Sequence, residues 1–304
     1  MRYAVPLLLV MLSLACGDGS DRSPRATPAP SATLRDFPFS TPEPRPRRPL
    51  PTGLGSFDGN TPLPELPPDT AVYLSLGDSL QYGCCADPEL SSHPLFADYL
   101  SQRLKRPVVW VSLAGNDTLV EFIGGAGGQT PQLDRAVELL QRFRSEGRDV
   151  VAITLSIGGN DLLALRTQMG CTGGGRPECL EAFQEMLLRY PEQMEVVYSR
   201  LNAAKDPATP ILQNNYYDAM DCGRPGDEIS ASAVSVGIFN GYIEGVVRTR
   251  GAFLRDFSTA FRGRACEYIS GVDPTYAGYD AIFEVDRVLY ESLPSEFLEP
   301  FVRP

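Results

Sequence analysis

The chain of 304 residues contains a single histidine, His93. One imidazole cannot supply a histidine-rich metal site, and the cysteines form no Cys-x-x-Cys pair to complete a familiar zinc set. The glycine-rich stretches 124–128 and 173–175 neither end in Gly-Lys-Ser/Thr nor match the dinucleotide-binding fingerprint, so they are not phosphate loops. We therefore expect no metal and no cofactor, and we interpret both stretches as flexible rims of a cleft.

An excess of positive charge is also lacking, because the formal net charge is −11. Proteins that bind nucleic acid neutralise its phosphates with clustered lysine and arginine side chains. We therefore expect no nucleic-acid partner. The acidic balance fits the ordinary solubility of a protein surface.

The N-terminal apolar run, residues 4–14, is too short to span a bilayer as a helix. It follows Arg2 and leads into Ser13-Leu-Ala-Cys16, which resembles the lipobox of bacterial lipoproteins. We predict a signal peptide over residues 1–16 and a lipid anchor on Cys16. The protein would then be exported, extracytoplasmic and anchored to the bacterial cell membrane; an ordinary signal peptide with a chance cysteine is the alternative.

Residues 17–68 are rich in proline and hold 13 of the 27 prolines in the chain. Six arginines balance six acidic residues there, so the excess negative charge lies in the domain that follows. A segment of this composition buries too little apolar surface to offset its chain entropy. We predict an extended, disordered tether that lifts a domain of residues 69–304 away from the membrane.

Six cysteines remain beyond Cys16, and an even number in an exported chain indicates disulfides. Cys171 and Cys179 flank a short loop without periodicity, and we predict that they pair. Cys84 and Cys85 are adjacent, so they form either a vicinal disulfide or two separate bridges. The connectivity of the other cysteines stays open.

Apolar runs and amphipathic runs alternate from residue 70 onward, which predicts a parallel sheet with helices on both faces. We predict a flavodoxin-like three-layer α/β/α sandwich with a mostly parallel five-stranded sheet in the order 2-1-3-4-5. The predicted strands are 71–76, 108–113, 150–157, 210–217 and 252–257. The predicted helices are 94–104, 131–144, 178–204, 231–249 and 276–292.

Each of the first three strands is followed by a loop that carries a group useful for acyl transfer. The loops are Gly77-Asp78-Ser79-Leu80, Ala114-Gly115-Asn116-Asp117 and Gly158-Gly159-Asn160-Asp161. All three open at the carboxyl edge of the sheet, where open α/β folds hold their ligands. A hydroxyl, a glycine N–H and an asparagine amide that converge there make a nucleophile and an oxyanion hole.

These loops resemble blocks I, II and III of the SGNH/GDSL hydrolases, serine esterases and lipases on a flavodoxin-like sheet, over about residues 70–292. The resemblance implies that Ser79 is the nucleophile and also supplies its backbone N–H to the oxyanion. It implies that Gly115 supplies a second N–H and Asn160 a side-chain amide.

Several neighbouring residues have more ordinary interpretations. We expect Asp78 to hydrogen-bond local backbone and Asp161 to act as a structural acceptor. Tyr216 and Tyr217, after the fourth strand, either line an acyl or sugar pocket or pack in the core.

The fourth block departs from the family pattern. The family carries Asp-x-x-His here, whereas this chain has Ser270-Gly-Val-Asp273-Pro-Thr, so Asp273 stands at the histidine position and Ser270 at the aspartate position. A serine hydroxyl is a weak nucleophile until a base takes its proton. A carboxylate with a pKa of ~4 is a poor base at neutral pH unless burial raises that pKa. Asp273 at the matched position, or His93 at the start of the first predicted helix and near the cleft mouth, is the candidate base.

Two functions follow from this pattern. The first is an ester hydrolase for small acyl or acetyl esters, lipid or glycan, that acts through Ser79 with an altered base. The second is a catalytically impaired pseudoenzyme that binds an ester, a lipid or a glycan at the cell surface. The sequence leaves the acyl group and the oligomeric state open.

Overall fold

The computed structural model describes residues 57–58, 65–83, 90–167, 171, 176–222 and 231–303. The predicted signal peptide with Cys16, most of the tether, Cys84 and Cys85, and the glycine stretch 173–175 lie outside the described residues. In the part that is described, we find no helix with the length and apolarity that a membrane crossing requires.

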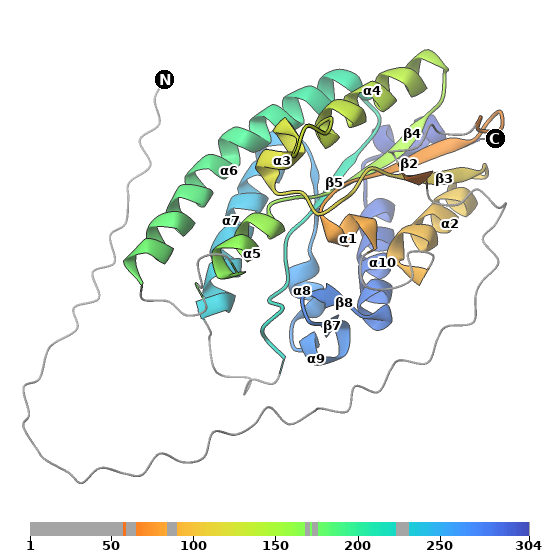
Figure 1. Ribbon diagram of the computed structural model, residues 1–304. Helices are drawn as coiled ribbons and strands as arrows, with labels where there is room; N and C mark the ends of the chain where they lie inside the picture. Colours follow the sequence, from red (N-terminus) through yellow and green to blue (C-terminus); the bar gives the residue numbers. More distant parts are fainter. Residues whose placement is uncertain are drawn as a thin grey trace, which may run out of the picture. The chain divides into compact units, whose positions relative to one another are not determined.

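Six of the described strands form one parallel sheet in the order β1-β3-β2-β4-β5-β6 (Figure 1). Without the two-residue edge strand β1, this is the predicted order 2-1-3-4-5. The fully buried runs of β2 and β4 read as near-continuous apolar sequence because helices cover both faces. The strands are β1 (Phe57–Asp58), β2 (Ala71–Gly77), β3 (Val108–Ser112), β4 (Val150–Ser156), β5 (Ile211–Asn214) and β6 (Phe253–Arg255).

The folded part begins ahead of residue 69, where we predicted that the domain starts. Phe57 and Asp58 pair with β3, and Leu66 is buried in the core. These three residues therefore belong to the domain, although the sequence around them is rich in proline.

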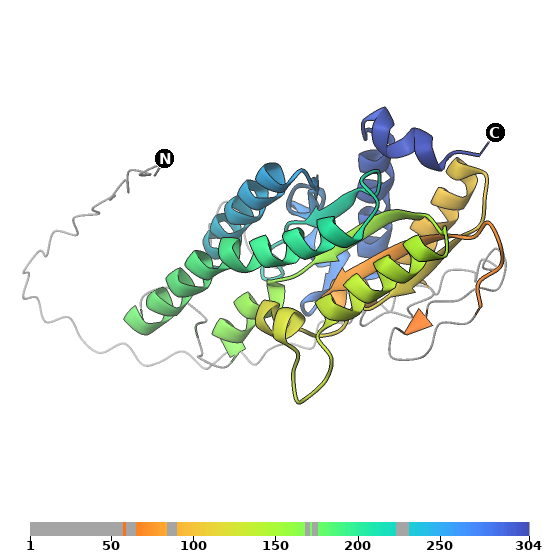
Figure 2. The same cartoon turned by 90° about the horizontal axis from the view of Figure 1, so that it is seen from above.

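Helices cover both faces of the sheet, so the predicted three layers are present (Figures 1 and 2). Successive β2 side chains alternate between the two cores, as the pleat requires. One core packs beneath α3 (Leu119–Gly124), α4 (Gln132–Ser145), α6 (Pro177–Ala204) and α7 (Ala231–Arg250). The other lies beneath α2 (Ser92–Leu104) and the C-terminal part of α10 (Tyr276–Glu291).

Short helices and one hairpin complete the fold. A separate antiparallel hairpin, β7 with β8, lies between α9 and α10. These elements are α1 (Ser79–Tyr82), α5 (Gly159–Thr167), α8 (Phe257–Phe261), α9 (Ala265–Tyr268), β7 (Ile269–Ser270), β8 (Asp273–Pro274), α11 (Ser295–Leu298) and a final 3₁₀ turn (Glu299–Phe301).

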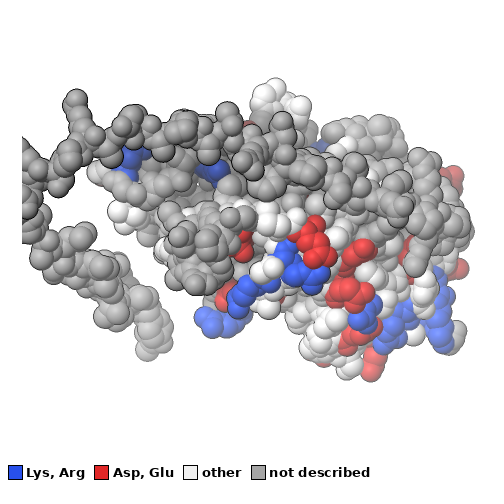
Figure 3. Space-filling view, turned by 90° about the horizontal axis from the view of Figure 1, so that it is seen from below, with Lys and Arg blue, Asp and Glu red and all other residues white. Residues whose placement is uncertain are grey.

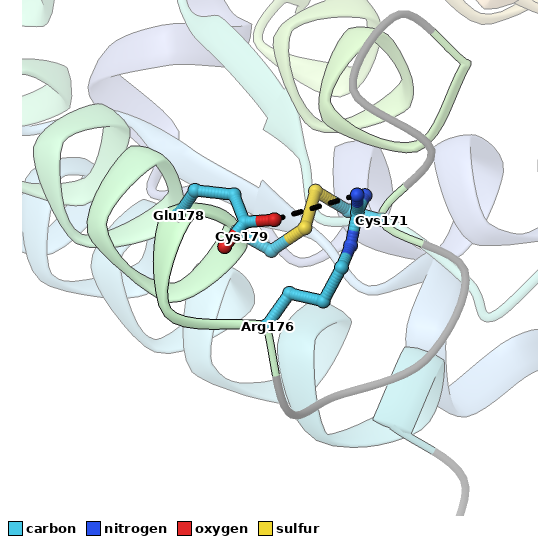
Figure 4. Close-up of a disulfide and its surroundings, with 4 residues drawn as sticks. All are labelled: Cys171, Arg176, Glu178 and Cys179. Atoms are coloured by element: carbon cyan, nitrogen blue, oxygen red, sulfur yellow. Dashed lines mark ion pairs between the residues drawn. A yellow bond between two sulfur atoms is a disulfide. The ribbon is translucent and has the colours of Figure 1, made fainter.

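Two disulfides join described residues. Cys171 pairs with Cys179, as predicted, and this bridge fixes the start of α6 beside the Arg176–Glu178 ion pair (Figure 4). Cys222 pairs with Cys266 and joins the segment after β5 to α9. On the face shown in Figure 3, basic and acidic side chains lie beside one another and form no single basic patch.

Candidate active site

Ser79 lies at the carboxyl end of β2, as the first residue of α1 (Figure 1). The chain turns sharply at Gly77, whose φ of +116° favours glycine, and a Cβ there would overlap the Ser156 carbonyl. Asp78 then caps α1 by accepting a hydrogen bond from the Leu80 N–H at 3.2 Å. The turn therefore places the Ser79 hydroxyl at the sheet edge that the sequence predicted.

Asp78 is a buried structural acceptor, as expected. The Tyr216 hydroxyl donates to its second carboxylate oxygen at 2.6 Å and lies 3.2 Å from the Ser156 hydroxyl. Burial raises the pKa of Asp78 to about 6, and the hydrogen bonds from Tyr216 and Ser156 oppose that rise. Tyr216 therefore packs in the core and holds the turn of residues 77–79 through Asp78, which answers the question that the sequence left open for this residue.

The Gly115 N–H, expected to face an oxyanion, donates instead to the Gly77 carbonyl at 2.9 Å. This bond continues the ladder between β2 and β3 beyond the last paired residues, because Leu113 makes the same type of bond to Ser75. In this structure, Gly115 joins the second loop to the turn at Gly77.

A glutamine that the sequence reasoning missed strengthens the same connection. Gln132, buried at the start of α4, accepts from the Gly77 N–H at 2.5 Å and donates to the Gly77 carbonyl at 3.1 Å. Its amide also donates to the Asp117 carboxylate at 2.9 Å. No local pattern marks such a residue, because its partners lie 55 and 15 positions away in the chain.

Asn160 lies in the first turn of α5, and its amide donates to the Asp117 carbonyl at 3.1 Å. Gly158 makes the tight approach to this turn with a φ of +107°, and a Cβ there would meet Phe239 at 2.7 Å. Asp161 accepts from the Leu119 N–H at 2.8 Å and is a structural acceptor, as expected. The loops with Asn160 and Gly115 are therefore adjacent.

Asp273 begins β8 and pairs across the hairpin with Ser270 of β7. The side chain of Ser79 lies beside the Asp273 carboxylate and favours the ionised form. Partial burial raises the pKa of Asp273 above its ordinary value, and the interaction with Ser79 opposes that rise. Ser270 is exposed and faces Asp273 through the backbone ladder. Ser79 and the residue at the histidine position thus lie close together.

His93 does not lie near the mouth of a cleft, contrary to our expectation. It is 1% exposed and stacks on Trp110, with ring centroids 4.9 Å apart. Its Nε2 lies 3.0 Å from the Leu80 carbonyl, which can only accept, so we assign the proton to Nε2. Nδ1 then accepts from the Tyr73 hydroxyl at 2.7 Å, and burial lowers the pKa of the imidazole to about 3. Both ring nitrogens are bonded to groups other than the Ser79 hydroxyl. His93 therefore stabilises α1 through the Leu80 carbonyl and is not placed to act as the base for Ser79.

Comparison with known proteins bears on the family and on the fold. The model of the GDSL-like Lipase/Acylhydrolase family matches residues 75–281. No curated protein matches the chain.

Similar solved structures include the lipase Lip_vut3 from a goat rumen metagenome, with 20% identity and a TM-score of 0.54 over 72% of this chain and 97% of that one. An extracellular lipase from Streptomyces rimosus has 18% identity and a TM-score of 0.53 over 72% of this chain and 99% of that one. Phospholipase A1 from Streptomyces albidoflavus has 16% identity and a TM-score of 0.51 with the same coverage. At these identities the likeness shows the fold alone.

Proposed function

Because the chain belongs to the GDSL-like lipase/acylhydrolase family, we propose that it hydrolyses esters through Ser79 with Asp273 as the base. The observation that carries this proposal is the proximity of the Ser79 and Asp273 side chains, through which Ser79 favours the ionised carboxylate. The Ser79 Oγ attacks the ester carbonyl, and Asp273 takes the proton of the Ser79 hydroxyl as it does so. The proton then passes to the leaving alcohol, and water hydrolyses the acyl-enzyme with Asp273 again as the base.

Two donors serve the oxyanion in this proposal. The Ser79 N–H lies at the first position of α1, where a helix leaves its amides without internal partners. The Asn160 amide carries two hydrogens, and the Asp117 carbonyl takes one of them. We assign Gly115 the task of joining the two loops, because its N–H is bonded to Gly77.

Turnover by such a pair should be slow. A carboxylate is a weaker base than an imidazole at neutral pH, although the partial burial of Asp273 reduces that difference. An acyl-transfer site that lacks one triad member still accelerates hydrolysis roughly 10³–10⁴-fold over water through its oxyanion hole and binding. Because a carboxylate ionises at lower pH than an imidazole, activity should persist further into acid than a histidine base allows.

The substrate class follows from the family, whose members act on esters. We propose small acyl or acetyl esters of lipids or glycans. The two disulfides fit an oxidising, extracytoplasmic compartment. A lipid anchor at Cys16 would hold the domain at the membrane, and that anchor is part of the proposal.

The second candidate is a binding protein without turnover. It would keep the notch, by which we mean the site formed by Ser79, Asn160 and Asp273. The loss of both the family histidine and its aspartate partner favours this candidate. Hydrolysis of a short-chain nitrophenyl ester by the mature chain separates the two. An esterase loses the activity in Ser79→Ala and loses about 10²- to 10⁴-fold in Asp273→Asn. Hydrolysis at buffer level in the unaltered protein and in both variants would contradict the enzyme and support the binder.

A repair experiment tests whether only the base is altered. The double change Ser270→Asp with Asp273→His restores the family residues at both positions. We expect it to raise turnover and to move the acid limb of the pH profile toward the ordinary histidine pKa of ~6.5. No gain in turnover would mean that the notch itself has diverged.

A further inference from the structure

The hairpin that carries Asp273 is too short to hold its own shape. Strands β7 and β8 have two residues each, and a hairpin of this size is not stable by itself. Gly271 and Val272 form its turn; Gly271 has a φ of +69°, and Val272 is 37% exposed. The position of Asp273 must therefore be set by contacts with the rest of the protein.

Tyr217, from the segment after β5, makes a direct contact with this turn. Its hydroxyl donates to the Val272 carbonyl at 2.9 Å. That carbonyl belongs to the peptide bond that joins Val272 to Asp273, so the contact acts on the backbone of the proposed base. The Tyr217 ring is stacked on Phe261, with centroids 4.4 Å apart and planes inclined by 9°.

The other contacts act on the ends of the hairpin. The Cys222–Cys266 disulfide joins the same segment after β5 to α9. The Thr275 N–H donates to the Tyr268 carbonyl at 2.8 Å, beyond β8. The disulfide precedes β7 and the Thr275 bond follows β8, whereas Tyr217 holds the turn between the two strands.

We infer that Tyr217 is a positioning residue, which sets the Asp273 carboxylate against the Ser79 hydroxyl through the Val272 carbonyl. This inference rests on the proposed function. Burial raises the pKa of Tyr217 well above its ordinary value, so the hydroxyl stays a donor throughout the working range of the site. A tyrosine that merely filled the core would have no bearing on the ionisation of Asp273.

The test is Tyr217→Phe, which keeps the ring stack and removes only the hydroxyl. A misplacement of about 1 Å in a catalytic group costs about 10²-fold, so we expect kcat to fall about 10- to 100-fold while KM changes little. We also expect the acid limb of the kcat/KM profile to move, because Asp273 would change its burial and its interaction with Ser79.

Tyr198→Phe is the matched control. The Tyr198 hydroxyl is also buried and donates to the side chain of Gln213. Tyr198, however, lies on α6, away from the hairpin. This variant should lose stability and keep kcat, KM and the pH profile. Rates are compared per folded molecule, from circular dichroism at low temperature.

The outcomes separate the inference from the proposed function. A folded Tyr217→Phe with unchanged kcat and pH profile overturns the inference, whereas loss of activity in Asp273→Asn still upholds the proposed base. An unaltered rate in Asp273→Asn overturns the base itself. If Tyr217→Phe fails to fold, Phe261→Leu tests the inference in its place. This substitution loosens the stack of Phe261 on the Tyr217 ring and keeps the Tyr217 hydroxyl. It should lower kcat in the same direction by a smaller factor, and an unchanged kcat would refute the role.

Discussion

The burial of His93 leads to a prediction about stability that also tests the choice of base. In His93→Gln the amide nitrogen can donate to the Leu80 carbonyl and the amide oxygen can accept from Tyr73, which are the partners of the neutral imidazole. Glutamine cannot take up a proton. The substitution therefore removes the titration while it keeps both hydrogen bonds in kind.

The size of the effect follows from the two pKa values of His93. Burial lowers the pKa from the ordinary 6.5 to about 3 in the folded protein, so the unfolded chain binds the proton more readily. The contribution of His93 to stability is complete above 6.5 and falls as the pH decreases, by about 1.4 kcal/mol per pH unit. Between pH 6.5 and about pH 4.5, the loss is about 2 kcal/mol, because the slope reaches its full value only once the unfolded histidine is mostly protonated.

Asp78 acts in the opposite sense. Its pKa is raised from 3.8 to about 6, so the folded state binds that proton more readily and gains stability as the pH falls through this window. The unaltered protein therefore shows a partly cancelled pH dependence. The difference between it and His93→Gln isolates the histidine, because Asp78 contributes equally to both.

Urea unfolding at a series of pH values measures this difference. At about pH 7.5 the variant should be less stable by about 1 kcal/mol, since the stack on Trp110 is lost. The gap should close as the pH falls and reverse by about pH 4.5. A gap that stays constant would show that the imidazole is not held neutral. Ester hydrolysis should survive the substitution, and its loss in a folded variant would make His93 the base.

Two further predictions concern stability. Asp286→Asn should cost about 3–5 kcal/mol in thermal denaturation, because it leaves the fully buried Arg255 without its bidentate carboxylate partner, and a cost below 1 kcal/mol would contradict that burial. Replacing Cys222 and Cys266 by serine, which opens a loop of sequence separation 44, should cost about 4 kcal/mol in the chain-entropy account. Opening the 171–179 loop, of separation 8, should cost about 2.5 kcal/mol, and the reverse order in urea unfolding would refute the account.

The fold could be predicted because its signals are local. The fully buried β4 is a near-continuous run of apolar residues, and the predicted strand 150–157 differs from it by one residue. Glycine at positions 77 and 158 marks the turns, because backbone with φ near +110° suits no other residue. The strand order follows from the alternation of strands and helices together with the chirality of their crossovers.

The contacts within the site could not be predicted, because they join residues far apart in the chain. Tyr217 and Val272 are 55 positions apart, and His93 and Tyr73 are 20 apart. For His93, the sequence indicated correctly that a helix starts nearby. It did not indicate that the helix begins at Ser92 and turns the imidazole toward Tyr73 and Trp110.

The geometry of the notch does not depend on the residue at the base position. Gln132 and Gly115 hold the second loop to Gly77. Tyr216 holds the turn of residues 77–79 by its hydrogen bond to Asp78. None of these contacts involves an imidazole, so replacement of the family histidine leaves this turn and the Asn160 loop in place. What changes is the proton affinity of the group beside Ser79. Under the proposed function, the rate would therefore be governed by the environment of Asp273, which is set by the hairpin and by the residues that hold it.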